Sequence, residues 1–272
     1  QNMVKNYLLK KIKKKYIIWE AYTCDNEKWI DCKFDLSFKL LKSKKTKTEY
    51  IYSVSKILRK MNELSPGFAD QGLNISTTLE FKRNWGLGSS STLINNISNW
   101  LNINPYELLK ITYKGSGYDI AVANSKKSIF FQKRDDFNEI TKADFSPPFK
   151  DNLFFVHLNK KVSSQKEVIK FLTHKSEFKD EISKINCLGN RIIREKNQKK
   201  FNEILKEHEE VISNIVCKKP IQKTLFKDFY GQIKSLGSWG GDFILASGDN
   251  ETPNYFSKKG FNTIIPFSDM KL

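Results

Sequence analysis

One stretch decides the fold expected for this chain: Arg83-Asn84-Trp85-Gly86-Leu87-Gly88-Ser89-Ser90-Ser91-Thr92-Leu93-Ile94. Two glycines are followed by four hydroxyl residues, and these open directly into a segment with helical spacing of apolar residues at 93–101. Before the stretch, residues 73–81 alternate apolar and polar side chains, which is the period of a half-buried strand. The sequence therefore predicts a strand, a Gly/Ser loop and a helix in that order.

The loop has the chemistry of a phosphate site. Glycines let backbone N–H groups approach an anion without obstruction by Cβ, and a helix start offers unpaired N–H donors and the positive end of its dipole. The adjacent hydroxyls can cap the helix, donate to phosphate oxygens or bind Mg²⁺. The alternative is an ordinary helix cap after a flexible turn, but four consecutive hydroxyl residues exceed what one cap needs. The spacing fits neither the Walker loop nor the dinucleotide-binding fingerprint.

Gly86-Leu87-Gly88-Ser89-Ser90 resembles the second motif of the GHMP kinases, the superfamily of galacto-, homoserine, mevalonate and phosphomevalonate kinases. Two later stretches resemble further family motifs in the right order. They are the Ser-Gly-x-Asp segment Gly115-Ser116-Gly117-Tyr118-Asp119-Ile120-Ala121-Val122-Ala123 and the glycine-rich third motif Leu236-Gly237-Ser238-Trp239-Gly240-Gly241-Asp242-Phe243. The residues Gly-Tyr-Asp-Ile-Ala at 117–121 suggest a bacterial subgroup close to the mevalonate and phosphomevalonate kinases. The match runs from about residue 29 to the end, and three ordered motifs are far more specific than one.

The resemblance implies roles for particular residues. Asp119 would be the catalytic base, which accepts the proton of the substrate hydroxyl as that hydroxyl attacks the γ-phosphate of ATP. Ser90, with Glu107 as a poorer second candidate, would bind the Mg²⁺ ion that bridges the phosphates. The nucleotide would be bound by Gly86, Leu87, Gly88, Ser89, Ser90 and Ser91, and the substrate by Ser116, Gly117, Lys161, Ser163, Ser164, Gly240 and Gly241.

These segments also have purely structural interpretations. Asp119 could cap a helix, which is a common role for aspartate. Residues 160–166 could be a serine-capped helix start with solvated lysines, and nothing in the sequence separates this from substrate contact. The glycines of the third motif could end a helix around a buried indole, because Trp239 is unusually large for a motif of small residues.

The beginning of the chain departs from the family pattern. In the GHMP kinases a first motif on an N-terminal strand and loop supplies substrate contacts, and nothing before Tyr16 resembles it. Either the sequence begins downstream of the natural start or this element has been lost, and a missing edge strand would expose backbone donors and apolar surface. We expect residues 5–15 to form a solvated edge or tail, followed by a hairpin of strands at 16–22 and 29–34.

Composition restricts the class of protein. The 272 residues are 39% hydrophobic and 13% aromatic, which is typical of a folded globular chain. No apolar run approaches the ~20 residues of a membrane span, and the first residues lack the apolar core of a signal peptide. The chain has three histidines, and its four cysteines form no Cys-x-x-Cys pair. We expect free thiols in a reducing cytoplasm and no metal cluster.

The formal net charge of +17 is compatible with nucleic-acid binding. The lysines are spread over the whole chain, however, and no basic motif is interleaved with aromatic residues. We therefore rank nucleic acid well behind anionic small molecules, whose approach a positive field would assist. No membrane partner is expected, and the protein is expected to be a monomer or a homodimer.

The remaining pattern predicts an α+β fold in two halves. Helices are expected at 49–61, 93–101, 105–112 and 220–234, and a long helical region at 176–215. Strands are expected at 128–132, 152–158 and 261–267, and residues 237–246 are expected to form a loop followed by a strand. By resemblance this is the two-lobed GHMP kinase fold. Residues 1–148 would form an N-terminal nucleotide-binding domain of mixed strands and helices, and residues 149–272 a C-terminal domain of helices on an antiparallel sheet.

The function implied by the resemblance is ATP-dependent transfer of the γ-phosphoryl group to an alcohol or phosphate acceptor. Mevalonate and phosphomevalonate, which are isoprenoid precursors, are the first candidates for the acceptor, and ATP and Mg²⁺ are the expected cofactors. Two other classes of function stay open. A GHMP-fold protein that only binds a nucleotide or metabolite would keep the loop at 86–90 without turnover. The interpretation as a nucleic-acid-binding protein would rest on the net charge alone.

Overall fold

The computed structural model describes residues 6–112, 115–125, 127–134, 137–162, 164–173, 177–237, 239 and 241–270. The chain divides into two compact units. Unit 1 consists of Gln1–Arg83 and Leu87–Lys142, and unit 2 of Asn84–Gly86 and Ala143–Leu272. The two glycines of the predicted phosphate loop therefore belong to different units. The domain roles expected for residues 1–148 and 149–272 stay predictions.

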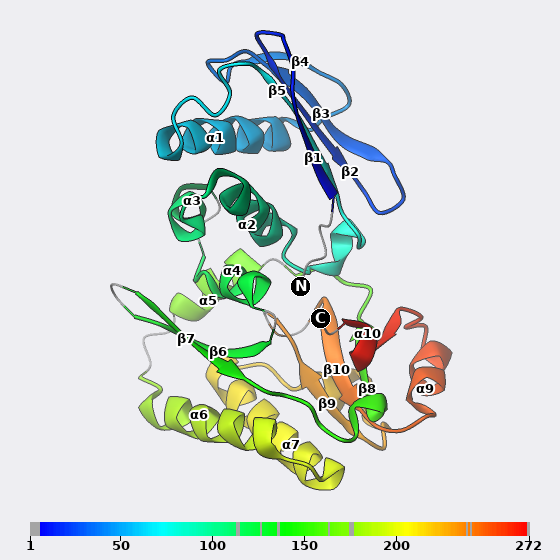
Figure 1. Cartoon of the computed structure of the whole chain (residues 1–272). Helices are drawn as coiled ribbons and strands as arrows, with labels where there is room; N and C mark the ends of the chain where they lie inside the picture. Colours follow the sequence, from blue (N-terminus) through cyan, green and yellow to red (C-terminus); the bar gives the residue numbers. More distant parts are fainter. Residues whose placement is uncertain are drawn as a thin grey trace. The chain divides into compact units, whose positions relative to one another are not determined.

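Unit 1 is built on a five-stranded sheet with the order β1-β5-β2-β3-β4 (Figure 1). Its strands are β1 (Asn6–Lys11), β2 (Ile17–Tyr22), β3 (Lys28–Phe34), β4 (Leu40–Ser43) and β5 (Leu73–Thr78). β2 and β5 run parallel, with Trp19 opposite Ile75, and the other neighbours pair antiparallel. Alternate residues of β2 are buried, and β2 pairs with β3, which confirms the hairpin predicted from 16 to 34.

Helices cover one face of this sheet. α1 (Thr48–Leu64) lies along the sheet, and α2 (Ser89–Leu101), α3 (Pro105–Thr112) and α4 (Tyr118–Asn124) contribute to the same apolar core (Figure 1). This core joins Trp19 and Phe34 of the strands to Leu58 of α1, Ile94 of α2 and Leu108 of α3. The helices predicted at 49–61, 93–101 and 105–112 are thus confirmed. A two-stranded hairpin of β6 (Ser128–Lys133) and β7 (Asn138–Ala143) follows α4.

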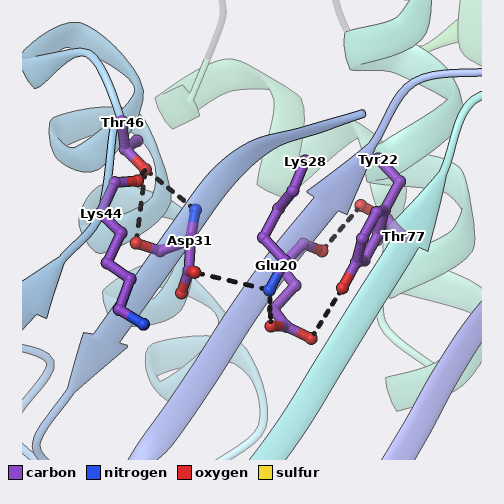
Figure 2. Close-up of polar contacts among 7 residues, drawn as sticks. All are labelled: Glu20, Tyr22, Lys28, Asp31, Lys44, Thr46 and Thr77. Carbon is purple, nitrogen blue, oxygen red and sulfur yellow. Dashed lines mark hydrogen bonds and ion pairs between the residues drawn. The ribbon is translucent and has the colours of Figure 1, made fainter. Parts of the chain in front are cut away.

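The opposite face of the sheet is polar (Figure 2). Lys28 of β3 forms an ion pair with Glu20 of β2 and a second one, at 3.4 Å, with Asp31. Tyr22 donates to the Glu20 carboxylate at 3.3 Å, and Thr77 of β5 donates to the Glu20 carbonyl at 3.4 Å. The hydrogen bond to Glu20 is the main reason that the pKa of Lys28 is raised. The ion pairs thus link β2 to β3, and the Thr77 hydroxyl links β5 to the backbone of β2.

Unit 2 is built on a four-stranded antiparallel sheet with the order β11-β8-β10-β9. Every residue of β10 is buried, which makes this strand the centre of the unit. α6 and α7 pack together, and α7 lies against β9 (Figure 1). This arrangement confirms the prediction of helices on an antiparallel sheet. The strands are β8 (Leu153–His157), β9 (Gln232–Ser235), β10 (Phe243–Ser247) and β11 (Ile264–Pro266), and the helices are α5 (Ser164–Leu172), α6 (Lys179–Arg194), α7 (Gln198–Val216), α8 (Ile221–Leu225), α9 (Thr252–Lys258) and α10 (Phe267–Met270).

The N-terminal segment contains a strand rather than a tail. β1 pairs antiparallel with β5, with Lys10 opposite Asn74, and it forms the edge of the sheet beside β5. Residues 5–15 were expected to form a solvated edge or tail; for residues 6–11 the edge is confirmed and the tail is wrong. Strand pairing uses backbone N–H and C=O groups, and lysines are common on edge strands because they discourage pairing with other chains. A basic run is thus compatible with an edge strand.

The helix predicted at 220–234 is wrong in its second half, because α8 ends at Leu225 and residues 232–235 form β9. Gly231 allows β9 to approach β10, since a Cβ atom at this position would lie 2.1 Å from the Ser247 carbonyl oxygen. The Gln222 side chain links α8 to β9: it donates to the Gly231 carbonyl at 2.9 Å and accepts the Ile233 amide at 2.9 Å. Tertiary pairing has overridden the local helical pattern.

The helical region predicted at 176–215 consists of two helices. Glu195 ends α6 with an extended backbone, and Asn197 caps α7 by accepting the Lys200 amide at 3.1 Å. The predicted strand at 261–267 is present at Ile264–Pro266, and β7, α9 and α10 were not predicted. Within the described part of the chain, none of the helices combines the length and apolar character needed to cross a membrane.

Candidate functional site

α2 begins directly after the second glycine of the loop. Gly88 is the N-cap residue, its φ of +73° lies in the left-handed region that favours glycine, and no side chain caps the helix. The Gly88 carbonyl accepts the Thr92 amide and the Thr92 hydroxyl, each at 3.1 Å. The amides of Ser89, Ser90 and Ser91 precede this first helical bond, so the helix itself supplies no acceptor for them. The loop thus presents a row of backbone donors at the positive end of α2.

Asp119 lies beside this helix start. It is the second residue of α4, and Gly117, with a φ of +85°, is the N-cap residue of that helix. The Ser91 side chain lies near the Asp119 carboxyl and acts on its pKa as a hydrogen-bond donor, and a Cβ atom added to Gly88 would lie 3.9 Å from Asp119 Cγ. The carboxyl therefore lies at the first turn of α2. The interpretation of Asp119 as a helix cap is wrong, because Gly117 occupies the cap position.

The surroundings of Asp119 suit a proton acceptor. The residue as a whole is exposed, yet protein atoms around its carboxyl displace part of its water. This desolvation raises the pKa of Asp119 above the ordinary aspartate value, and the hydrogen bond with Ser91 partly opposes the shift by favouring the charged form. A carboxylate with a raised pKa is a stronger base, and its exposure leaves it open to a substrate.

The other candidate residues of unit 1 have structural contacts. The Ser116 hydroxyl accepts the Tyr118 amide at 3.3 Å at the start of α4. Gly117 is buried, and a Cβ atom there would lie 2.8 Å from the Tyr106 ring. Glu107 is exposed in the first turn of α3. The substrate roles of Ser116 and Gly117 and the magnesium role of Glu107 stay predictions.

In unit 2, the third motif forms the loop between β9 and β10. Gly241 is packed tightly within it, because a Cβ atom there would lie 2.0 Å from Val162 Cγ2. The Asp242 amide donates to the Lys160 carbonyl at 2.7 Å, and Asp242 Oδ1 accepts the Val162 amide at 3.3 Å. The third motif therefore lies alongside residues 160–162, two segments that the resemblance assigned to substrate binding.

Asp242 is a residue of interest that the sequence did not single out. A Cβ atom added to Gly86 would lie 2.4 Å from Asp242 Cγ, so this carboxyl lies directly against the backbone of the loop's first glycine. Burial raises the pKa of the Asp242 carboxyl, while the Val162 amide and the charges of Lys161 and His157 oppose the shift. The available signal was an aspartate directly after two glycines. Nothing in the sequence, however, places it next to Gly86.

Trp85 explains why residues 84–86 belong to unit 2. Its ring centroid lies 5.7 Å from that of Phe243 in an edge-to-face arrangement, and 6.3 Å from that of His157. These contacts hold the residue before Gly86 against β8 and β10. The first glycine of the loop is therefore fixed by the packing of unit 2.

The remaining candidates lie in or near the third motif. Trp239 is 6% exposed, which confirms the buried indole, but the element before the motif is strand β9, so the helix C-cap interpretation is wrong. Ser164 is the first residue of α5, and Lys161 is exposed. Ser163 and Gly240 lie outside the described residues. The substrate roles of Lys161, Ser164 and Gly241 stay predictions.

Comparison with known proteins identifies the fold. No family model and no curated protein matches the sequence. The structure of the Lin0012 protein from Listeria innocua matches with a TM-score of 0.64 and 16% sequence identity, covering 96% of this chain and 87% of that chain. The mevalonate kinase of Methanococcus jannaschii matches with a TM-score of 0.59 and 17% identity, covering 93% and 83%. The galactokinase of Lactococcus lactis matches with a TM-score of 0.57 and 15% identity, covering 93% and 79%.

Identities this low establish a shared fold and nothing finer. The two enzymes act on different acceptors, as their names state, so the fold leaves the acceptor open. Both belong to the superfamily that the three motifs resemble, and the matches cover nearly the whole chain. The chain therefore has the two-lobed fold of the GHMP kinases, as its three ordered motifs predicted.

Proposed function

We propose that this protein is an ATP-dependent kinase of a small molecule. One observation carries the proposal: the Asp119 carboxyl lies at the first turn of α2, near Ser91 and Gly88. A proton acceptor and a row of backbone donors for which the helix supplies no acceptor are thus adjacent within unit 1. Phosphoryl transfer requires little else of a protein than positioning and charge stabilisation at such a place.

The first turn of α2 would bind the phosphates of the nucleotide. The amides at 89–91 would donate to phosphate oxygens, and the positive end of α2 would stabilise their charge. Gly88 brings the backbone close to the phosphates, because its left-handed φ and missing side chain leave the approach open. The net charge of +17 would assist the approach of an anionic nucleotide.

Asp119 would act as the general base. As the acceptor's hydroxyl oxygen forms a bond to the γ-phosphorus, the proton of that hydroxyl moves to the Asp119 carboxylate. The bond between the γ-phosphorus and the bridging oxygen breaks, and ADP leaves with the negative charge. The hydrogen bond with Ser91 would orient the carboxylate for this transfer.

The oxygen donors present fit Mg²⁺ bound mainly by the nucleotide. Ser90 supplies a hydroxyl in the first turn of α2, and oxygen ligands are the ones that Mg²⁺ prefers. Among the described residues, no group of three His, Cys, Asp or Glu side chains could hold a metal ion. This suits an ion with one or two protein ligands and several phosphate or water ligands. When bound, Mg²⁺ would neutralise charge on the β- and γ-phosphates.

The acceptor is proposed to be a small alcohol or a phosphorylated one, with mevalonate and phosphomevalonate as the first candidates. The three motifs resemble those of kinases for these compounds, and a mevalonate kinase is among the similar structures. Lys161 and Ser164 would contact the anionic end of such an acceptor, since Lys161 is exposed at the segment that adjoins the third motif. A galactokinase is similar to nearly the same degree, so a sugar belongs in the test panel.

Replacement of Gly88 tests the phosphate site. Gly88→Val places a branched side chain where the phosphates would approach, and we expect ATP affinity to fall by about tenfold or more, the equivalent of losing one or two charge-assisted hydrogen bonds. Gly260→Val is the matched control, because Gly260 has a φ of +86° and open space around its Cα. The two variants should lose similar thermal stability, and calorimetric titration with ATP should separate them. Unchanged ATP binding in a folded Gly88→Val protein would contradict the site.

Replacement of Asp119 separates an enzyme from a binding protein. Asp119→Asn keeps the size and the hydrogen bond with Ser91 but removes the proton acceptor. Turnover with ATP and the best acceptor should fall by ~10²–10⁴-fold while ATP affinity persists. Turnover near that of the wild type would remove Asp119 from the mechanism. A wild-type protein that binds ATP yet phosphorylates no acceptor in the panel would favour a binding-only function.

Replacement of Ser91 tests the hydrogen bond to the base. Because this bond favours the charged carboxylate, Ser91→Ala should raise the pKa of Asp119 further. The base must be deprotonated to act, so the acid limb of the kcat profile should move to higher pH. Asp119→Asn should abolish that limb. An acid limb at the same pH in wild type and Ser91→Ala would show that another group controls it.

A further inference from the structure

Glu209 of α7 is a buried carboxylate that lies in none of the three motifs. The residue is 2% exposed and accepts hydrogen bonds from the Ser235 hydroxyl at 2.8 Å and from the Trp239 indole Nε1 at 3.2 Å. Lys234 Nζ lies 3.4 Å from Glu209 Oε1 and completes the set of donors. Burying a carboxylate is costly unless it is paired and hydrogen-bonded, and all three of these partners lie in β9 or in the loop that follows it.

The hydrogen bond from the Trp239 indole to Glu209 helps to hold Trp239 in an unfavourable backbone conformation. Its φ of +62° lies in the left-handed region, which is costly for a bulky side chain and persists only where the surroundings enforce it. The Trp239 amide donates to the Leu236 carbonyl at 3.3 Å, and the indole is buried against unit 2. The Glu209 carboxylate fixes the polar end of this ring. The backbone conformation of the loop therefore depends on a side chain of α7.

The loop of the third motif ends at Asp242, directly before β10, and the Asp242 carboxyl contacts Gly86. Asp242 follows Trp239 by three positions and itself has a φ of +52°. Its amide is bonded to the Lys160 carbonyl, its carboxyl accepts the Val162 amide, and the same carboxyl lies against Gly86. Trp239 and Asp242 thus lie three residues apart in one motif, and the Asp242 carboxyl touches the first glycine of the phosphate loop.

We propose that Glu209 is a positioning residue for the first glycine of the phosphate loop: by holding Trp239 it keeps Asp242 against Gly86. This inference rests on the proposed function, because it assigns Glu209 an effect on nucleotide binding. Glu209 contacts neither the loop at 86–91 nor Asp119 and acts only through Trp239 and Asp242.

The experiment uses two variants and one control in the full-length protein. Glu209→Gln removes the charge, and Trp239→Phe keeps a ring but removes the indole N–H. Gln222→Met is the control, because the Gln222 side chain also bonds to β9, at Ile233, and to Gly231 just before it, but forms no hydrogen bond with the described residues of the third motif. Two measurements are made on each protein: hydrogen exchange at the Val162 and Asp242 amides, and the KM for ATP together with kcat.

We expect Glu209→Gln and Trp239→Phe to speed exchange at the Val162 and Asp242 amides by about tenfold, as for the loss of one buried hydrogen bond. The KM for ATP should rise, with a smaller change in kcat. Gln222→Met should leave both quantities near the wild-type values at comparable thermal stability. These outcomes would support a positioning role for Glu209.

Two results would overturn the proposal. The first is exchange at the Val162 and Asp242 amides that is unchanged in both variants or increased equally in Gln222→Met, since Glu209 would then be a general stabilising residue. The second is faster exchange with an unchanged KM for ATP in an active enzyme, since the loop would then not affect nucleotide binding. If the wild type has no kinase activity, the proposed function fails separately, and calorimetric ATP affinity replaces KM in the same comparison.

Discussion

The proximity of the Asp119 carboxyl to Ser91 and Gly88, at the point where α2 begins, is the contact on which the candidate site depends. It brings the first turn of α2 beside the first turn of α4. The same contact holds a base with a raised pKa next to a row of backbone donors for which the helix supplies no acceptor. The packing of unit 1 supports it, because Ile94 of α2 and Ile120 of α4 share the core beneath the sheet.

Unit 2 supplies the other constraint on the loop. Trp85 packs on Phe243, and Gly86 lies against the Asp242 carboxyl, so the residues before Leu87 are fixed by β10 and the third motif. The third motif in turn is held by Glu209 through Trp239. Both Gly86 and Gly88 have a left-handed φ, at +69° and +73°, which favours glycine. Gly86 in addition avoids a collision with Asp242.

Local patterns in the sequence predicted much of the fold and part of the site. Helical spacing predicted α1, α2 and α3, and the Gly/Ser loop predicted that a helix begins directly after it. The strand β1 was missed because it forms by pairing with β5, far along the chain, which local periodicity does not reveal. β9 was missed because its residues continue a local helical pattern, although they pair with β10. Asp242 and Glu209 were missed because their contacts join segments far apart in the chain. The proximity of Asp119 to Gly88 was expected only through a family resemblance, since no spacing rule connects them.

The most direct test of the central claim is a crystal structure of the protein with Mg²⁺ and a non-hydrolysable ATP analogue. The account predicts that the β- and γ-phosphates lie within hydrogen-bond distance of the backbone amides at 88–91, with the Asp119 carboxyl facing the γ-phosphate. Phosphates bound elsewhere in the protein, or an Asp119 side chain turned away from the γ-phosphate, would contradict it. Failure of the analogue to bind at millimolar concentration would contradict it equally.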